Sequence, residues 1–217
     1  MRDFMALPEV TGRDRIRLYV STILFQWVLA GIVGWRARAR GLTLRELGLI
    51  GGSAPSIILL AFAGGVVIAA AHWMNMRRIA RSKHPAAGAL RAMGARLFPQ
   101  SAIQFVFYVL LAATAGCCEE FLFRGFVIAN LFHLGLSVWI VVLLSSLMFG
   151  GAHLYQGKSG SIGTMILGVV FGLVRIAYHS LLPVVLWHAV LDTVAGIAGA
   201  RYLIGKESEV GPVSPMQ

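Results

Sequence analysis

Three short stretches of this 217-residue chain carry ionisable side chains inside or at the ends of apolar runs. In chain order, the residues are Glu119, Glu120 and Arg124, then His153, then His188 and Asp192. A charged group at the centre of a bilayer costs roughly 2.5–3.5 kcal/mol on insertion scales. These six residues are therefore the candidate functional residues of the chain.

The first stretch separates two neighbouring carboxylates. Glu120 and Arg124 stand four residues apart, so on a helix they share a face and can pair. Glu119 lies about 100° further round the helix axis and has no local cation. In an apolar site such a carboxylate is a candidate general base. The alternative is a helix that starts at the membrane surface with acidic residues at its N-terminal end.

The histidines and the aspartate belong to two later runs. A single histidine such as His153, at the end of an apolar run, is more often an interfacial residue than a catalytic one. His188 and Asp192 stand four residues apart within another apolar run, so they face the same way on a helix. Packing does not explain an aspartate whose one neighbouring cation is a histidine, so we favour a functional site there.

Three helices could bring these residues to one buried polar site. Glu119, His153, His188 and Asp192 together can position and deprotonate a water molecule. The residue types also suit a divalent metal such as zinc, with Glu119, His153 and His188 as candidate ligands. The residues alone leave both possibilities open, and no cofactor is certain.

The elements that must position these residues are predicted to be membrane helices. The chain is 58% hydrophobic and 13% charged, with a mean hydropathy of +0.77, whereas soluble domains are about 45–50% apolar and about 25% charged. The runs are continuous rather than alternating, which indicates helices and not barrel strands. We therefore predict an all-α, polytopic membrane helix bundle with about six to eight membrane segments. The candidate spans are 18–35, 55–74, 101–118, 119–134, 136–152, 161–178 and 181–200.

Two details of this organisation stay open in the sequence. Residues 101–118 and 119–134 form either one long broken helix or two segments that meet at Cys117–Glu120. Arg36–Ser53 and Arg77–Gln100 are either interfacial amphipathic segments or solvated linkers. We expect residues 1–204 to form a single integral membrane domain, with the catalytic half at about 100–200, and residues 205–217 to form a polar, disordered tail.

The charge pattern points to lipid rather than nucleic acid. Most of the 19 Lys and Arg residues, which give a net charge of +10, flank the apolar runs, where basic residues anchor helices and set topology. Their distribution favours a cytoplasmic N-terminus. Cys117 and Cys118 are adjacent and imply no disulfide framework. We expect a multi-pass integral membrane protein, in the cell membrane if the source is bacterial.

The three stretches, in this order, resemble the signature motifs of the CPBP family, which includes the type II CAAX prenyl endopeptidases and many bacterial Abi-type proteins. The motifs are Glu119-Glu120-x-x-x-Arg124, Phe149-x-x-x-His153 and His188-x-x-x-Asp192. The resemblance covers about residues 100–200 and implies hydrolysis of a peptide bond in a membrane-associated substrate, which could carry a lipid. It implies that Glu119 is the general base, assisted by His153. It also implies that Glu120 and Arg124 hold the helix and that His188 and residue 192 stabilise the oxyanion.

One position departs from the family pattern. The CAAX endopeptidases usually carry asparagine where this chain has Asp192, and an ionised aspartate can only accept hydrogen bonds. Asp192 could instead orient His188, be protonated, or help to hold a metal. The family has been described both as metalloproteases and as metal-independent glutamate peptidases, and the sequence decides neither.

Other membrane functions could use parts of the same pattern. No histidine is followed by glutamate, so the HExxH motif of zinc proteases is absent. Gly157-Lys158-Ser159-Gly160 imitates the GxSG of rhomboid proteases, with His188 as partner, but this dyad leaves the Glu-Glu-Arg motif unexplained. A non-catalytic membrane scaffold, immunity or transport protein could use the same buried polar site for binding. Our prediction is an intramembrane endopeptidase whose partners are a membrane-associated peptide or protein and the bilayer, with no nucleic acid.

Overall fold

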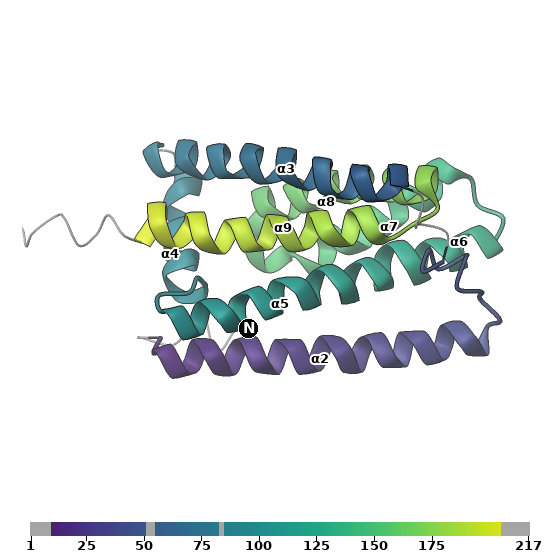
Figure 1. Ribbon diagram of the computed structural model, residues 1–217, viewed down its shortest axis with the longest axis horizontal. Coiled ribbons are helices and arrows are strands. Elements are labelled where there is room, and N and C mark those ends of the chain that lie inside the picture. Colours follow the sequence, from purple (N-terminus) through teal and green to yellow (C-terminus); the bar gives the residue numbers. More distant parts are fainter. Residues whose placement is uncertain (1–9, 51–54, 83–84, 205–217) are drawn as a thin grey trace, which may run out of the picture.

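The computed structural model describes residues 10–50, 55–82 and 85–204, and the regular structure in these ranges is entirely helical (Figure 1). The predicted all-α fold is therefore confirmed. The predicted disordered tail, 205–217, lies outside the described residues, as do positions 51–53 and 83–84 of the two polar segments. The elements are α2 (Gly12–Ala39), α3 (Pro55–Arg81), α4 (Pro85–Leu97), α5 (Ala102–Glu120), η1 (Phe121–Val127), α6 (Ile128–His133), α7 (Val138–Ala152), η2 (Leu154–Gln156), α8 (Gly157–Tyr178), α9 (Leu182–Gly199) and η3 (Ala200–Ile204).

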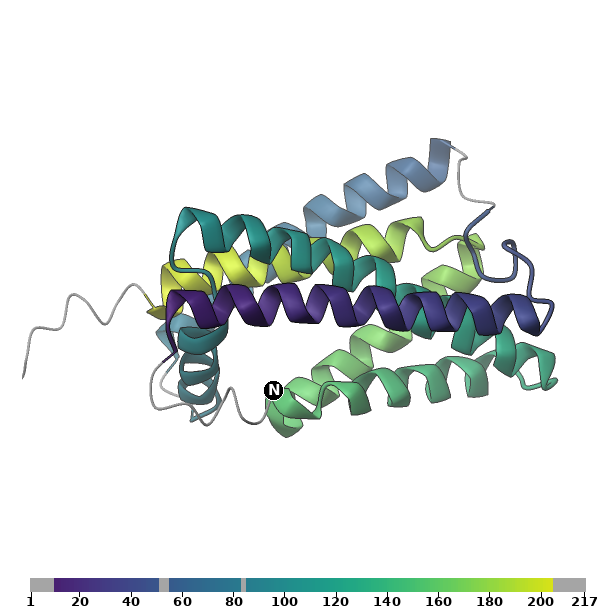
Figure 2. The same cartoon turned by 90° about the horizontal axis from the view of Figure 1, so that it is seen from below.

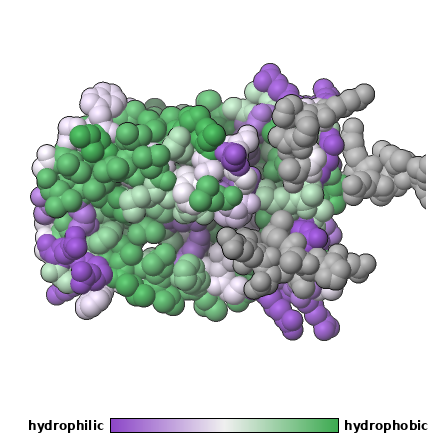
Figure 3. Space-filling model, turned by 180° about the vertical axis from the view of Figure 1, so that it is seen from behind, coloured by the Kyte–Doolittle hydropathy of each residue, from purple (hydrophilic) through white to green (hydrophobic). Residues whose placement is uncertain are grey.

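Within the described ranges, five helical stretches are long and apolar enough to cross a membrane. They are Gly12–Ala39, Pro55–Arg81, Ala102–His133, Leu154–Tyr178 and Leu182–Ile204, and the shorter helix Val138–Ala152 is also apolar. The long helices are exposed over much of their length, and large apolar side chains such as Phe25, Phe62 and Trp139 point outward. In Figure 3 the apolar surface fills the middle of the visible face and polar residues gather toward both ends. The protein is therefore an integral membrane protein.

The two polar segments, Arg36–Ser53 and Arg77–Gln100, differ in structure over their described residues. Residues Arg77–Gln100 are mostly helical, because α3 continues to Arg81 and α4 follows from Pro85. Figure 1 shows α4 lying across one end of the bundle, where α2 begins and α3 ends. After α2, residues 40–50 form turns, in which Thr43 and Glu46 bond each other. These turns lie near α6 at the opposite end (Figure 2), where the Glu46 carboxylate lies 2.7 Å from His133 Nε2.

The open question at Cys117–Glu120 resolves as one continuous helix. α5, η1 and α6 run without a break from Ala102 to His133. The π-helical turn, Phe121–Val127, starts directly after Glu120 and contains Arg124. Such π-turns inside helices are frequent at functional sites.

Small residues set the distances between the helices that carry the candidate site. A Cβ added to Gly116 of α5 would lie 2.7 Å from the backbone oxygen of Val185 and 3.1 Å from the nitrogen of Ala189, both on α9. A Cβ on Gly168 of α8 would lie 3.1 Å from Ser146 of α7. Glycine at these positions lets the helix backbones approach closely, which brings their polar residues together.

Candidate active site

Glu120 lies at the centre of a buried ionic cluster. Its Oε1 accepts a hydrogen bond of 2.9 Å from Arg124 Nη1 and lies 2.7 Å from His188 Nδ1. The Glu120 and Arg124 side chains are both 0% exposed. The Arg124 bond joins neighbouring turns of one helix, as predicted, but the His188 contact joins α5 to α9 across 68 residues. Because a carboxylate ion only accepts hydrogen bonds, His188 Nδ1 carries the proton.

Arg124 is enclosed by aromatic rings. The carbon of its guanidinium lies 4.0 Å from the ring centroid of Phe149, 5.7 Å from Phe171 and 6.0 Å from Phe123. Rings at such distances attract a cation through their negative faces. This enclosure and Glu120 offset part of the cost of removing the guanidinium from water, while Arg124 Nε and Nη2 have no hydrogen-bond partner among the described residues. The cluster thus fixes α5, α7, α8 and α9 to one another.

Glu119 is in a different environment from its neighbour. Its Oε1 accepts a 2.7 Å hydrogen bond from Nε2 of Gln26, in the middle of α2. Its Oε2 lies 3.6 Å from His153 Nε2 and 3.9 Å from His188 Nε2. Oε2 is buried and has no hydrogen-bond partner among the described residues. One oxygen of this carboxylate is therefore held, while the other faces two imidazoles.

His153 presents an acceptor to that free oxygen. Its Nδ1 lies 2.8 Å from the backbone oxygen of Phe149, which can only accept, so Nδ1 carries the proton in the neutral ring. Nε2 then has a lone pair and faces Glu119 Oε2, which is also an acceptor. Two acceptors 3.6 Å apart do not bond directly, but one water molecule can donate a hydrogen to each.

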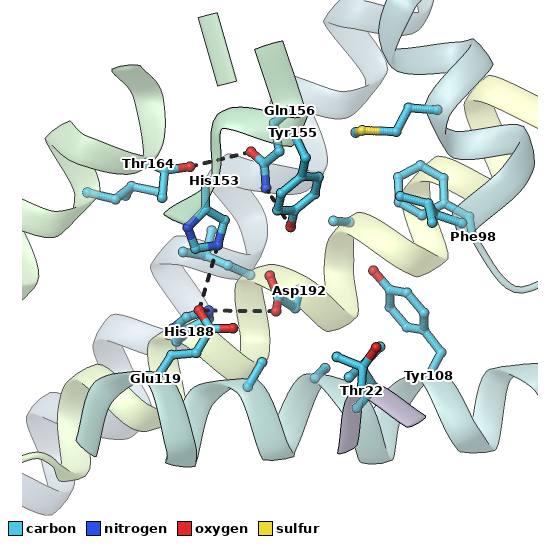
Figure 4. A pocket seen from close by; sticks show the side chains of 18 of the residues that line it. Thr22, Phe98, Tyr108, Glu119, His153, Tyr155, Gln156, Thr164, His188 and Asp192 are labelled. Carbon is cyan, nitrogen blue, oxygen red and sulfur yellow. Dashed lines mark hydrogen bonds and ion pairs between the residues drawn. The ribbon is translucent and has the colours of Figure 1, made fainter. Parts of the chain in front are cut away.

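Asp192 lies near the same ring nitrogen of His188 as Glu119 does. One of its oxygens lies 3.7 Å from His188 Nε2, and the side chain is 42% exposed. Figure 4 shows Glu119, His153, His188 and Asp192 converging on one place. His72 of α3 lines the same cavity.

The site opens into a cavity of about 360 Å³. The four converging residues lie at one end of its lining, and Tyr108 and Phe98 lie further along it (Figure 4). Much of the remaining wall is apolar and comes from α2, α4, α5 and α8; its residues include Leu18, Leu90, Met93, Leu97, Leu111 and Leu167. A cavity of this size accepts a short stretch of extended peptide or an apolar chain.

The residue types at the centre include possible metal ligands. Glu119, His153 and His188 do come together, but no group of three or more His, Cys, Asp or Glu residues in the described ranges is arranged so that it could hold a metal. We therefore derive no step through a metal.

The structure separates the predicted site residues from the other candidate. All six predicted residues lie in or directly behind the cavity wall, whereas Ser159 is exposed near the start of α8 and does not line the cavity. Gln26 and His72 were not predicted from the sequence. Each is a polar residue within a hydrophobic run, and this pattern is a sequence signal by which they could have been predicted.

Fold and site together define an α-helical membrane protein with a carboxylate and imidazole centre inside its bundle. Residues 99–194 match the family model of type II CAAX prenyl endopeptidases, described as Rce1-like. This match confirms the predicted resemblance to the CPBP, or CAAX protease, family over this part of the chain, and the family implies a protease activity in general terms. No curated protein and no solved structure matches the chain.

Proposed function

We propose that this protein is an intramembrane endopeptidase that hydrolyses a peptide bond in a membrane-associated substrate, with Glu119 as the general base. The observation that carries the proposal is the pair of free acceptors, Glu119 Oε2 and His153 Nε2, 3.6 Å apart at the wall of the cavity. Water bound between them would give a proton to Glu119 as it attacks the substrate carbonyl carbon.

The other residues would act on the products of that attack. His188, when protonated on both nitrogens, would donate from Nε2 to the oxyanion of the tetrahedral intermediate. Glu120 would hold the ring through Nδ1, so that Nε2 stays directed into the cavity. The protonated Glu119 would then give its proton to the leaving amine, which restores the carboxylate. Arg124 would act only through Glu120.

Asp192 would serve a role other than that of the asparagine at this position in the CAAX endopeptidases. Its carboxylate lies beside His188 Nε2, where it would favour a positively charged ring by Coulomb attraction. It would also face the leaving group, because it is the more exposed of the two carboxylates near Nε2. In these roles Asp192 would increase the rate of peptide hydrolysis without being essential for it.

The test is cleavage of a library of quenched peptides, some of them lipidated, by protein purified in detergent. Wild type, Glu119→Gln and Ser159→Ala are run side by side, with and without a chelator. We expect Glu119→Gln to lower kcat about 10²–10⁴-fold and Ser159→Ala to match wild type. Thermal unfolding of each variant shows that the protein is folded.

Three other results would change the proposal. Loss of cleavage in Ser159→Ala alone would replace Glu119 by a serine nucleophile. Loss of wild-type activity with the chelator, restored by zinc, would add a metal to the mechanism. If folded wild type cleaves none of the peptides, so that its cleavage rate equals that of Glu119→Gln, the result would favour a binding function for the buried site.

A further inference from the structure

Gln26 is a polar residue halfway along α2, outside the residues that match the family model. Its amide nitrogen reaches across 93 residues of sequence to within 2.7 Å of Glu119 Oε1. The carboxylate oxygen is an acceptor, so the nitrogen end of the amide must face it and donate. The direction of this hydrogen bond is therefore fixed by the chemistry of the two groups.

The bond restrains a side chain that otherwise has little to hold it. Glu120 Oε1 is fixed by Arg124 and His188, but among the described residues Gln26 is the one hydrogen-bond partner of the Glu119 carboxylate. With Oε1 bound to α2, the carboxylate plane is set and Oε2 is directed at His153 and His188. A catalytic group held by such a neighbour loses less entropy when it reaches the reactive geometry.

α2 is well placed to provide this restraint. It packs along α5, the helix of Glu119, and Tyr19 of α2 meets Tyr108 of α5 edge to face, with 5.6 Å between the ring centroids. The Tyr19 hydroxyl also donates to the backbone oxygen of Leu97, after which the chain turns into α5. Gln26 thus lies on a helix whose position relative to Glu119 is fixed by neighbouring contacts.

We propose that Gln26 is a positioning residue for the catalytic carboxylate, which it holds from outside the matched part of the chain. This inference rests on the proposed role of Glu119. Gln26 acts through the orientation of Glu119, because it bonds Oε1 and not Oε2, the oxygen that faces the two histidines. Its loss should lower the rate of the chemical step and leave substrate binding almost intact.

The experiment compares wild type with Gln26→Met, which keeps the length of the side chain and removes the donor. Ser21→Ala is the control, because Ser21 lies on the exposed side of the same helix. We expect kcat to fall about 10–100-fold in Gln26→Met, with KM within about threefold of wild type. Thermal unfolding measured in the same detergent corrects each rate for the folded fraction.

A second readout is independent of activity. For each protein, the infrared spectrum is compared with that of the same protein carrying the additional substitution Glu119→Gln. The difference between the two spectra isolates the carboxylate stretch of Glu119. We expect this band to shift in Gln26→Met, because the carboxylate loses its donor, and to stay unchanged in Ser21→Ala. A merely structural role of Gln26 would not move the band.

The outcomes separate this inference from the proposed function. If wild type is active, Glu119→Gln is inactive and Gln26→Met keeps the wild-type kcat, the positioning role is wrong and the catalytic role of Glu119 stands. An unshifted infrared band in Gln26→Met would likewise overturn the contact. If wild type cleaves no peptide but the band shifts, the proposed peptidase reaction fails while the restraint of Glu119 by Gln26 is supported.

Discussion

The residues before 99 and the residues from 99 to 194 contribute to the same cavity in different ways. The later part, in α5 to α9, provides the ionic residues, and each has a close partner, such as Arg124 with Glu120. The earlier part, in α2 to α4, provides apolar walls such as Leu18 and Leu90. Its polar contributions to the lining include Gln26, which donates to Glu119, and His72.

This difference follows from what each interaction requires. A buried charge needs a partner at hydrogen-bond distance, so the type and spacing of residues such as Glu120 and His188 are tightly constrained. An apolar wall needs only volume and hydropathy, which many sequences supply. The later part therefore carries recognisable motifs, while the sequence of the earlier part indicates only hydrophobic membrane helices. Changes in the later part should affect folding and kcat, and changes in the walls should affect KM.

The largest effect should come from removing one member of the buried ion pair. In Arg124→Met the Glu120 carboxylate loses its cation while 0% exposed, and such a loss costs about 3–5 kcal/mol. Thermal unfolding in detergent should show a large fall in Tm, with loss of activity. Arg45→Met is the control, since Arg45 is exposed. If both variants unfold at the same temperature, the cluster does not hold the later helices together.

The next effect should come from the contact between α5 and α9. Gly116→Leu would push these helices apart, because even a Cβ would lie 2.7 Å from the Val185 oxygen. A displacement of about 1 Å between Glu119 and His188 is expected to lower kcat about 100-fold. Gly163→Leu on α8 is the control, because a Cβ there meets nothing within 4 Å. Equal rates in the two variants would show that the site tolerates movement of α9.

A smaller effect is expected in the walls. Arg15 of α2 donates to the backbone oxygens of Ala95 and Arg96, and so holds the end of α4 that contributes Leu97 to the cavity. Arg15→Met should raise KM about three- to tenfold and leave kcat unchanged, because the end of α4 loses two hydrogen bonds from a charged group while the apolar lining itself is unaltered. Arg17→Met, at a position 80% exposed, should match wild type. A fall in kcat instead would show that α4 also shapes the catalytic centre.

The smallest effect concerns Glu46, in the turns between α2 and α3. Hydrogen bonds from the Thr43 backbone, the His133 ring and the Thr43 hydroxyl lower the pKa of Glu46 from 4.5 to about 2. Because the pKa of Glu46 is lower in the folded protein than in the unfolded chain, the ionised carboxylate stabilises the folded state at pH values above 4.5. This contribution is lost as the pH falls toward 2. Because the carboxylate is well exposed, Glu46→Gln should lower Tm at pH 7 by no more than about 2–4 °C.

The pH dependence of Tm tests whether the ionised Glu46 carboxylate stabilises the turns. The difference in Tm between wild type and Glu46→Gln should shrink as the pH falls from 4.5 toward 2, as followed by unfolding in detergent. Arg38→Met, which changes an exposed arginine at the end of α2, should show no such narrowing. A difference that is independent of pH would mean that the Glu46 carboxylate does not stabilise the turns.

The sequence by itself determined the features that depend on composition and on spacing within one helix. Its hydropathy predicted the helical membrane bundle, and the four-residue spacing predicted the pair of Glu120 with Arg124 and the shared face of His188 and Asp192. Both follow because the helical period fixes which neighbours meet. The ordered motifs predicted the resemblance to the family and six site residues, of which four line the cavity, while Glu120 and Arg124 are buried behind it.

Only the tertiary structure decided which groups meet between helices. The contact of His188 with Glu120, and that of Gln26 with Glu119, depend on how closely α9 and α2 approach α5. That approach depends on the absence of a side chain at Gly116 and on the shapes of many facing residues, which have no fixed spacing in the sequence. Hydropathy determines which helices can lie in the membrane, and packing between helices determines that Glu119 Oε2 has no hydrogen-bond partner among the described residues.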